Sequence, residues 1–413
     1  MDAIIITIGD EILVGQTVDT NSAHIAKELN HLGISVKEIV SISDTAKHII
    51  KTVDQSIGNC DFLILTGGLG PTNDDITKKV LTDYFKDELV MHPTVLERIK
   101  GYFERFNKPF LEVNALQAML PKKATILENE LGTASGMWFK EKGCNVLSMP
   151  GVPYEMRGLM EKFTEAISKE YAVGNFYHRT VQVIGIGESY LAEMLESWET
   201  KNRSEGISVS YLPSVGTLKL RLTGKLEQKE TIDRRIQHLI DTYGKYVIGG
   251  EFDTIEKVIG TLLIRKQMTL GTVESCTGGS IAKKIVSISG SSAFYLGSIV
   301  SYTNKLKEEL VGVKKTTLVE NGAVSAAVVK EMAENGREKL GIDYCISVSG
   351  IAGPTGGTDD KPVGTVWIGI ATPDATYTKL FNYGLNRERN IQATVLASLN
   401  FLRLILTDQI TSE

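Results

Sequence analysis

The chain has 413 residues, of which 42% are hydrophobic and 23% are charged. This balance excludes an intrinsically disordered protein, and the length predicts two or three domains. The net charge of −5 argues against a protein that coats nucleic acid or an anionic membrane, because binding to either surface requires an excess of basic residues.

The cysteines and the first residues predict a cytoplasmic location. The four cysteines stand singly, without C-x-x-C spacing, so we expect free thiols and neither a disulfide scaffold nor a zinc site. The apolar run at 3–8 is short and no basic residue precedes it, which is typical of a buried strand and not of a signal peptide. No stretch reaches the roughly 18 apolar residues of a membrane helix, so we expect no membrane contact.

Residues 1–170 predict a first domain in which strands alternate with helices. Strands are expected over 3–8, 35–42 and 61–66, and helices over 21–32 and 46–57. Strands that are apolar throughout and separated by helices are typical of a parallel sheet with helices on both faces. Ligands of such sheets bind beyond the carboxyl ends of the strands.

Residues 171–250 predict a small α+β domain. We expect strands over 180–184, 206–211 and 218–222, and helices over 189–199 and 229–243. Ten Lys and Arg residues stand against nine Asp and Glu residues in this stretch, so the domain is nearly neutral.

Residues 251–413 predict a second α/β domain, after a hinge at 249–254. Helices are expected over 255–266, 278–287, 326–340 and 387–406, and strands over 270–273, 298–302, 344–349, 365–371 and 376–383. The predicted fold class is therefore α/β, with two three-layer domains that have largely parallel sheets, joined by the small α+β domain.

A strand-to-helix turn in the last domain carries the sequence Glu-Ser-Cys-Thr-Gly-Gly at 274–279. Glycines at such a turn let the backbone approach a ligand, and a serine there can present its hydroxyl as a nucleophile. Ser275 is the candidate, and Cys276 is the rival nucleophile. The alternative is a tight turn in which Ser275 and Thr277 only satisfy the first backbone donors of a helix.

A serine nucleophile requires a base, and all six histidines lie before residue 239. A Ser-His-Asp arrangement within the last domain is therefore excluded. Lys307, directly after a predicted strand, can serve as the base if its pKa is lowered by burial or by neighbouring cations. The alternative is a solvated lysine on a helix surface.

A second glycine-rich segment, Ser-Gly-Ile-Ala-Gly-Pro-Thr-Gly-Gly at 349–357, follows another strand. It is typical of a loop that surrounds a small ligand with backbone amides. The terminal helix begins with Arg387 and Arg389, either of which could hold a phosphate or carboxylate. Both could also be ordinary surface charges.

The first domain places glycines and carboxylates at the ends of its strands, in Gly-Asp-Glu at 9–11, Gly-Gly-Leu-Gly-Pro-Thr-Asn-Asp-Asp at 67–75 and Pro-Gly at 150–151. This pattern suits a phosphorylated ligand held partly through a divalent metal, whose identity stays open. The alternative is a helix cap and a glycine turn. The residues expected to bind the ligand are Gly9, Asp10, Glu11, Gly67, Gly68, Gly70, Asn73, Pro150 and Gly151, and the expected metal ligands are Asp10, Asp74 and Asp75.

The last domain resembles the C-terminal domain of the CinA family. The resemblance rests on Glu-Ser-Cys-Thr-Gly-Gly, on Tyr302 with Lys307, and on the segment at 349–357 with its following Lys-Pro-Val-Gly. It implies a nicotinamide mononucleotide (NMN) amidase of the PncC type that needs no cofactor, with Ser275 as nucleophile, Lys307 as its base and Tyr302 nearby. The substrate-binding residues that it implies are Thr277, Gly278, Gly279, Ser349, Gly350, Ala352, Gly353 and an arginine of the last helix, of which we favour Arg389 over Arg387.

The first two domains resemble other parts of the same family. The motifs of residues 1–170 resemble the molybdopterin-binding-like half of CinA proteins, which implies an ADP-ribose pyrophosphatase that uses a divalent metal. Gly-Gly-Leu-Gly stands where molybdopterin-binding relatives have Gly-Gly-Thr-Gly, which argues against a molybdopterin role. Residues 171–250 resemble the KH-type insert, but Gly185-Ile186-Gly187-Glu188 does not match the G-x-x-G loop that clamps nucleic acid.

The sequence thus predicts a bifunctional hydrolase of pyridine-nucleotide salvage that acts on NMN and ADP-ribose. The middle domain is expected to be a spacer or a dimerisation element, and the resemblance favours a homodimer. Two alternatives stay open: an accessory protein of competence or DNA damage that acts by binding, and a molybdopterin-binding module.

Overall fold

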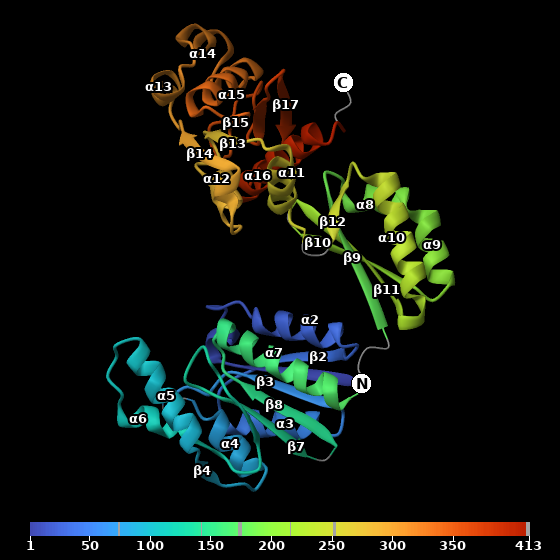
Figure 1. Cartoon of the computed structure of the whole chain (residues 1–413), viewed down its shortest axis with the longest axis vertical. Coiled ribbons are helices and arrows are strands. Elements are labelled where there is room, and N and C mark those ends of the chain that lie inside the picture. Colours follow the sequence, from blue (N-terminus) through green and yellow to red (C-terminus); the bar gives the residue numbers. More distant parts are fainter. Residues whose placement is uncertain (73–74, 142, 172–175, 215, 251–252, 410–413) are drawn as a thin grey trace. The chain divides into compact units, whose positions relative to one another are not determined.

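The computed structural model describes residues 1–72, 75–141, 143–171, 176–214, 216–250 and 253–409 (Figure 1). The chain forms two compact units, Met1–Phe176 and Tyr177–Glu413. Within the described ranges, no helix combines the length and the apolar composition needed to cross a membrane.

The first unit is built on a six-stranded sheet in the order β2-β1-β3-β8-β7-β6. The pairs β1–β2, β1–β3 and β3–β8 are parallel, whereas β7 pairs antiparallel with both β8 and β6. Its elements are β1 Asp2–Ile8, α1 Asp10–Leu13, α2 Asn21–His31, β2 Ser35–Ile42, α3 Ala46–Ser56, β3 Phe62–Thr66, α4 Thr77–Tyr84, β4 Leu89–Met91, α5 Pro93–Arg105, α6 Glu112–Ala115, η1 Leu116–Ala118, β5 Met119–Pro121, β6 Thr125–Leu127, β7 Gly136–Glu141, β8 Cys144–Met149 and α7 Pro153–Glu170.

Alternate side chains of the central strands enter two separate cores, because successive residues of a strand point to opposite faces. Ile4 and Ile6 of β1 belong to the core that includes Val53 of α3. Ala3 and Ile5 belong to the core that includes residues of α2 and α7. Figure 1 shows α2 and α7 on one face of this sheet and α3 and α4 on the other. The first unit is therefore a three-layer α/β sandwich.

The loops after the neighbouring strands β1 and β3 meet at the carboxyl edge of this sheet. Gly67, directly after β3, has a φ of +113°, and a Cβ atom built on it would lie 2.1 Å from the carbonyl oxygen of Ile8. Only glycine fits such an approach.

The second unit begins with a four-stranded sheet in the order β10-β11-β9-β12. Leu195, which is fully buried, separates α8 from α9 where one helix over 189–199 was predicted. Residues 249–250, predicted as part of a hinge, end a strand, and residues 251–252 lie outside the described residues. The elements are β9 Phe176–Ile184, α8 Glu188–Met194, α9 Glu196–Ser204, β10 Ser208–Ser214, β11 Thr217–Lys225, η2 Leu226–Gln228, α10 Lys229–Tyr243 and β12 Val247–Gly250.

A five-stranded sheet in the order β14-β13-β15-β16-β17 follows. The pairs β13–β14 and β13–β15 are parallel, and the hairpin of β16 and β17 completes the sheet with antiparallel pairs. The elements are α11 Ile255–Lys266, β13 Leu270–Glu274, α12 Ser280–Val286, η3 Ser291–Ala293, β14 Tyr295–Val300, α13 Asn304–Leu306, the π-helix η4 Lys307–Val311, α14 Lys315–Asn321, α15 Ala326–Leu340, β15 Tyr344–Gly350, β16 Thr365–Ala371, β17 Thr376–Asn382 and α16 Arg387–Leu406.

Helices cover both faces of this sheet. Ile346 of β15 belongs to the core that includes residues of α11, α12 and α16, whereas Cys345 belongs to the core that includes residues of α15. The predicted fold class is confirmed: two layered α/β folds with largely parallel sheets, and a small α+β fold between them in the sequence.

The turn between β13 and α12 is organised by the carboxylate of Glu274, which is fully buried. One carboxylate oxygen, Oε2, accepts hydrogen bonds from the Thr277 hydroxyl at 2.7 Å, the Gly279 N–H at 2.9 Å and the Ile281 N–H at 3.1 Å. The other, Oε1, accepts hydrogen bonds from the Ala282 N–H at 2.9 Å and the Thr272 hydroxyl at 3.3 Å. These donors include N–H groups at the start of a helix that would otherwise lack acceptors.

We predict that Glu274→Gln lowers the free energy of unfolding by about 3 kcal/mol, because a carboxamide has one acceptor oxygen and would turn its NH₂ group toward backbone N–H donors. Chemical denaturation of the full chain measures the change. Glu320→Gln, on the exposed surface of α14, is the matched control and should unfold like the wild type. Equal midpoints for Glu274→Gln and the wild type would contradict the prediction.

Candidate functional site

Ser275 and Lys307 lie in direct contact, although 32 residues separate them. Lys307 Nζ donates a hydrogen bond to Ser275 Oγ at 2.9 Å and a second one to the carbonyl oxygen of Ser301 at 3.0 Å. Ser275 follows β13, and its N–H donates to the carbonyl of Val348 on the neighbouring strand β15. The geometry is that of a hydroxyl nucleophile beside a candidate base.

Lys307 is 2% exposed and begins the π-helix η4. Burial lowers the pKa of its ammonium group, because removal from water disfavours the charged form. Its contacts in the described residues are oxygen atoms of Ser275 and Ser301, not a carboxylate. The side chain therefore lies beside Ser275 as a candidate base with a lowered pKa.

Cys276, the rival nucleophile, is 7% exposed. Burial raises the pKa of its thiol to about 12, so the reactive thiolate is scarce at neutral pH. This environment is that of a structural thiol and favours Ser275 as the reactive group.

Most backbone N–H groups of the turn at 277–279 already donate hydrogen bonds to acceptors within or next to the turn. The N–H of Gly278 donates to the carbonyl of Ser275, and the N–H of Gly279 donates to Glu274. The N–H of Thr277 has no acceptor among the described residues. Of the predicted substrate-binding amides at 277–279, that of Thr277 is therefore the one available to a ligand.

The glycine-rich segment after β15 is anchored to the rest of the domain. Ser349 donates its hydroxyl to the carbonyl of Ala323, and Asn390 of α16 donates its side-chain amide to the carbonyl of Ala352. A Cβ atom on Gly350 would lie 2.6 Å from Val366 Cγ2, so the strand needs glycine there.

Arg387 joins this segment to Tyr302. Its Nη1 donates to the carbonyl of Gly353 at 2.8 Å, and its Nη2 donates to the Tyr302 hydroxyl at 3.1 Å. Arg389 is exposed, and its backbone N–H donates to the Asn386 side chain. The structure thus brings Arg387 into this cluster, whereas ligand binding by Arg389 and a catalytic role of Tyr302 stay predictions.

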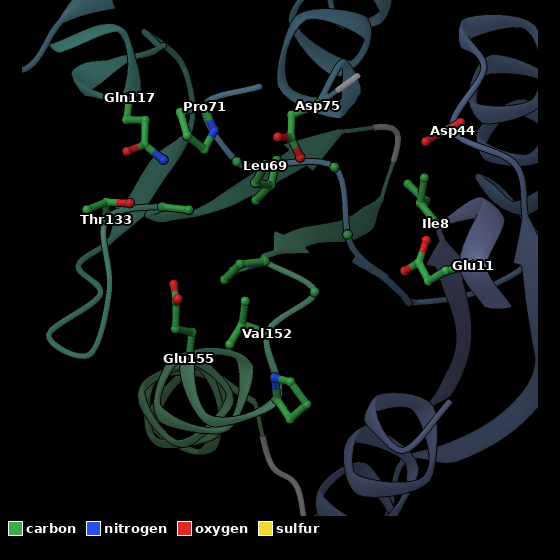
Figure 2. Close-up of a pocket in the computed structure, with 18 residues that line it drawn as sticks. Ile8, Glu11, Asp44, Leu69, Pro71, Asp75, Gln117, Thr133, Val152 and Glu155 are labelled. Carbon is green, nitrogen blue, oxygen red and sulfur yellow. The ribbon is translucent and has the colours of Figure 1, made fainter. Parts of the chain in front are cut away.

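A cavity of about 530 Å³ lies at the carboxyl edge of the first sheet. Figure 2 shows the side chains that line it, with Glu11 and Asp44 on one side of the view and Gln117, Thr133 and Glu155 on the other. The predicted ligand-binding residues that line it are Gly9, Glu11, Gly67, Gly68, Gly70, Pro150 and Gly151.

Buried polar groups hold the Pro150–Gly151 wall of this cavity in place. Asn21 Nδ2 donates to the carbonyl of Gly151 at 2.7 Å and to Thr66 Oγ1 at 3.2 Å. Thr66 in turn donates its hydroxyl to the carbonyl of Pro150 at 3.1 Å. This wall is therefore fixed by side chains from α2 and β3.

The predicted metal ligands are only partly at the cavity. Asp75 lines it, but Asp10 does not, and Asn73 and Asp74 lie outside the described residues. Among the described residues, no group of three or more His, Cys, Asp or Glu side chains could hold a metal ion. Glu11, Asp44 and Asp75 all line the cavity but do not gather into one set of three ligands. A divalent cation here would be held by only one or two of them, with water and substrate phosphates completing its shell, as Mg²⁺ often is.

Sequence reasoning assigned no role to several residues at these sites. Glu274 was quoted only as part of a motif, although a carboxylate between a buried strand and a helix start is a signal for a buried cap. Glu155 follows the Pro-Gly motif at 150–151; burial raises its pKa, and its Oε2 accepts a hydrogen bond from Asn129 Nδ2 at 2.6 Å. Asp44 and Gln117 belong to no motif.

Three family models match consecutive parts of the chain. They are described as "Probable molybdopterin binding domain" over residues 4–169, "Damage-inducible protein CinA KH domain" over 178–247 and "CinA C-terminal domain" over 252–406.

Several curated proteins and solved structures are similar to the chain. A "CinA-like protein" of Cytophaga hutchinsonii is 43% identical over 97% of this chain and 96% of its own length. Another, of Flavobacterium psychrophilum, is 42% identical over 97% of this chain and 98% of its own length.

A crystal structure of "the protein CinA with unknown function" from Thermoplasma acidophilum is 30% identical, covers 40% of this chain and 97% of its own, and has a TM-score of 0.37. A competence/damage inducible protein from Agrobacterium tumefaciens is 33% identical, covers 38% of this chain and 98% of its own, and has a TM-score of 0.35. On the identity and coverage of its curated relatives, this chain belongs to the CinA family.

Proposed function

We propose that the Ser275 site hydrolyses the carboxamide of NMN to nicotinate mononucleotide and ammonia. The proposal is carried by the 2.9 Å contact between Lys307 Nζ and Ser275 Oγ, in which the lysine is buried and its pKa is lowered. The motifs shared with the CinA family indicate the substrate. No cofactor is needed, because the nucleophile, base and proton donor are all side chains of this site.

The reaction proceeds through an acyl-enzyme. Ser275 Oγ attacks the carboxamide carbon while its proton passes to Lys307 Nζ, and the N–H of Thr277 stabilises the resulting oxyanion. Lys307 then returns the proton to the departing nitrogen, the C–N bond breaks and ammonia leaves. Water, deprotonated by Lys307, attacks the ester, and nicotinate mononucleotide is released as the proton returns to Ser275.

The nucleotide part of the substrate needs a cationic partner. Arg387 is exposed, and its guanidinium donates hydrogen bonds to the Gly353 carbonyl and the Tyr302 hydroxyl. We propose that Arg387 binds the 5′-phosphate, since a guanidinium forms charge-assisted hydrogen bonds with phosphate oxygens. Arg389 is the alternative.

We predict that Ser275→Ala abolishes ammonia release from NMN, because the attacking oxygen is lost. Cys276→Ala should retain most of the activity, because the thiol is buried and protonated. Both variants are assayed as full chains without added metal, with circular dichroism to show that they fold. If Cys276→Ala is the inactive variant, Ser275 is not the nucleophile.

We also predict that kcat/KM for NMN rises with pH through the lowered pKa of Lys307, because only the neutral amine accepts the proton of Ser275. The acid limb of the profile should lie below the usual lysine value of about 10.4. Lys307→Arg should be inactive at every pH, since guanidinium does not deprotonate in this range. A wild-type limb at the unshifted lysine value would contradict the assignment.

For the first unit we propose hydrolysis of ADP-ribose to AMP and ribose 5-phosphate. The proposal is supported by the cavity of about 530 Å³, which is lined by glycine loops at one sheet edge and by the carboxylates Glu11, Asp44 and Asp75. Glycine loops let backbone N–H groups approach phosphate oxygens. The volume is that of an ordinary small-molecule site.

A bound divalent metal would neutralise the diphosphate charge and activate water for attack on phosphorus. Asp75 is the predicted metal ligand that lines the cavity, Glu11 and Asp44 line it as well, and Asp74 stays a candidate. Asp75 is itself oriented by Thr72, whose N–H donates to Asp75 Oδ2 at 3.0 Å and whose hydroxyl donates to the same oxygen. The loop therefore presents a carboxylate in a fixed position.

We predict that Asp75→Asn lowers ADP-ribose hydrolysis in the presence of Mg²⁺ or Mn²⁺ by about 100-fold, because one anionic metal ligand is lost. Asp83→Asn, exposed on α4, is the matched control and should stay active. Release of AMP, followed by chromatography, measures the reaction. A wild-type chain that retains a pterin and does not cleave ADP-ribose would instead support the molybdopterin-binding alternative.

A further inference from the structure

Gln117 is a buried polar side chain without a partner in the described part of the chain. It is 4% exposed, and neither its Oε1 nor its Nε2 has a hydrogen-bond partner. It lines the cavity of the first unit, and Figure 2 shows its carboxamide directed into that space. Buried polar groups are nearly always paired in folded proteins, so an unpaired carboxamide at a cavity wall indicates a missing ligand.

The backbone around Gln117 is fixed independently of this side chain. Lys78 Nζ of α4 donates to the carbonyl of Leu116 at 2.8 Å, and the N–H of His92 donates to the carbonyl of Ala118 at 2.9 Å. The short helix η1 is thus tied down on both sides of Gln117. The carboxamide is held in position before any ligand binds.

The cavity has two chemically different ends. Glu11 and Asp44 lie on the side of the view away from Gln117 (Figure 2). Asp75 lies between Gln117 and these two carboxylates. Leu69, Pro71 and Ala134 also line the cavity and supply apolar surface. Thr133 and Glu155 lie on the Gln117 side of the view as well (Figure 2). The end with Glu11 and Asp44 suits a cation and a diphosphate, whereas apolar surface beside a few polar groups suits a flat nitrogen heterocycle.

We infer that Gln117 binds the adenine ring of the nucleotide and makes the first unit specific for adenine. This inference rests on the proposed ADP-ribose substrate and assigns the position of its base. Oε1 accepts a hydrogen bond from the 6-amino group, and Nε2 donates one to the adjacent ring nitrogen. A carboxamide presents this donor and acceptor side by side, which is why glutamine pairs with adenine through two hydrogen bonds.

The test compares AMP with purine riboside 5′-monophosphate, which keeps the ring nitrogens and lacks the 6-amino group. Calorimetric titration of the full chain without metal measures both affinities, so the readout does not depend on hydrolysis. Gln117→Met removes both hydrogen-bonding groups at similar volume. Gln55→Met, exposed on α3 and outside the cavity, is the matched control.

The wild type and Gln55→Met should bind AMP about 10-fold more tightly than the analogue, because the analogue leaves Oε1 unpaired in a buried site. Gln117→Met should bind the two nucleotides equally weakly: AMP loses two hydrogen bonds and the larger share of its affinity, whereas the analogue loses only the bond from Nε2 to its ring nitrogen. The inference is overturned if the wild type binds neither nucleotide or does not discriminate, or if Gln117→Met still prefers AMP. An equal loss for both nucleotides would also overturn it, because it would show a merely structural role.

The two proposals fail in different ways. A wild type that discriminates AMP but does not cleave ADP-ribose refutes the hydrolase and leaves the adenine assignment standing. A wild type that cleaves ADP-ribose and its analogue lacking the 6-amino group equally well refutes the adenine assignment and leaves the hydrolase standing.

Discussion

Glu274 ends a strand that is buried along its whole length, and the following turn and the first residues of the next helix supply hydrogen-bond donors to its carboxylate. A buried carboxylate is costly unless it is fully hydrogen-bonded. The turn between them must therefore keep one conformation, and Ser275 lies in that turn. The contact with Lys307 also depends on it, because Lys307 reaches the same point from η4 through a separate path of the chain.

The two candidate sites use buried polar groups in opposite ways. At Ser275 and Lys307 the hydrogen-bonding groups are already paired with each other, so the reactive geometry exists without substrate. At Gln117 the carboxamide lacks a partner among the described residues, so pairing there depends on the ligand. The first arrangement suits chemistry on a simple amide, and the second suits recognition of a particular ring.

The sequence predicts Ser275 as the nucleophile because it lies in a glycine turn at the end of a strand. It predicts Lys307 as the base because no histidine lies in the last domain. The sequence predicts a strand over 298–302, whereas β14 spans Tyr295–Val300. The start of this edge strand is hard to recognise, because its side chains alternate between buried and exposed and Gly297 interrupts the apolar pattern. Arg387 and Arg389 begin one helix on different faces, and sequence spacing does not say which face meets Gly353. Gln117 lies in a single 3₁₀ turn without periodicity, so its burial becomes visible only in the tertiary structure.

Each candidate site draws its described residues from one compact unit. The cavity at Gln117 is lined by residues of Met1–Phe176, and the contact of Ser275 with Lys307 lies within Tyr177–Glu413. Because both candidate sites lie on one polypeptide, every copy of the protein carries one of each. A cell therefore cannot change the ratio of the two sites unless it cuts the polypeptide or inactivates one site.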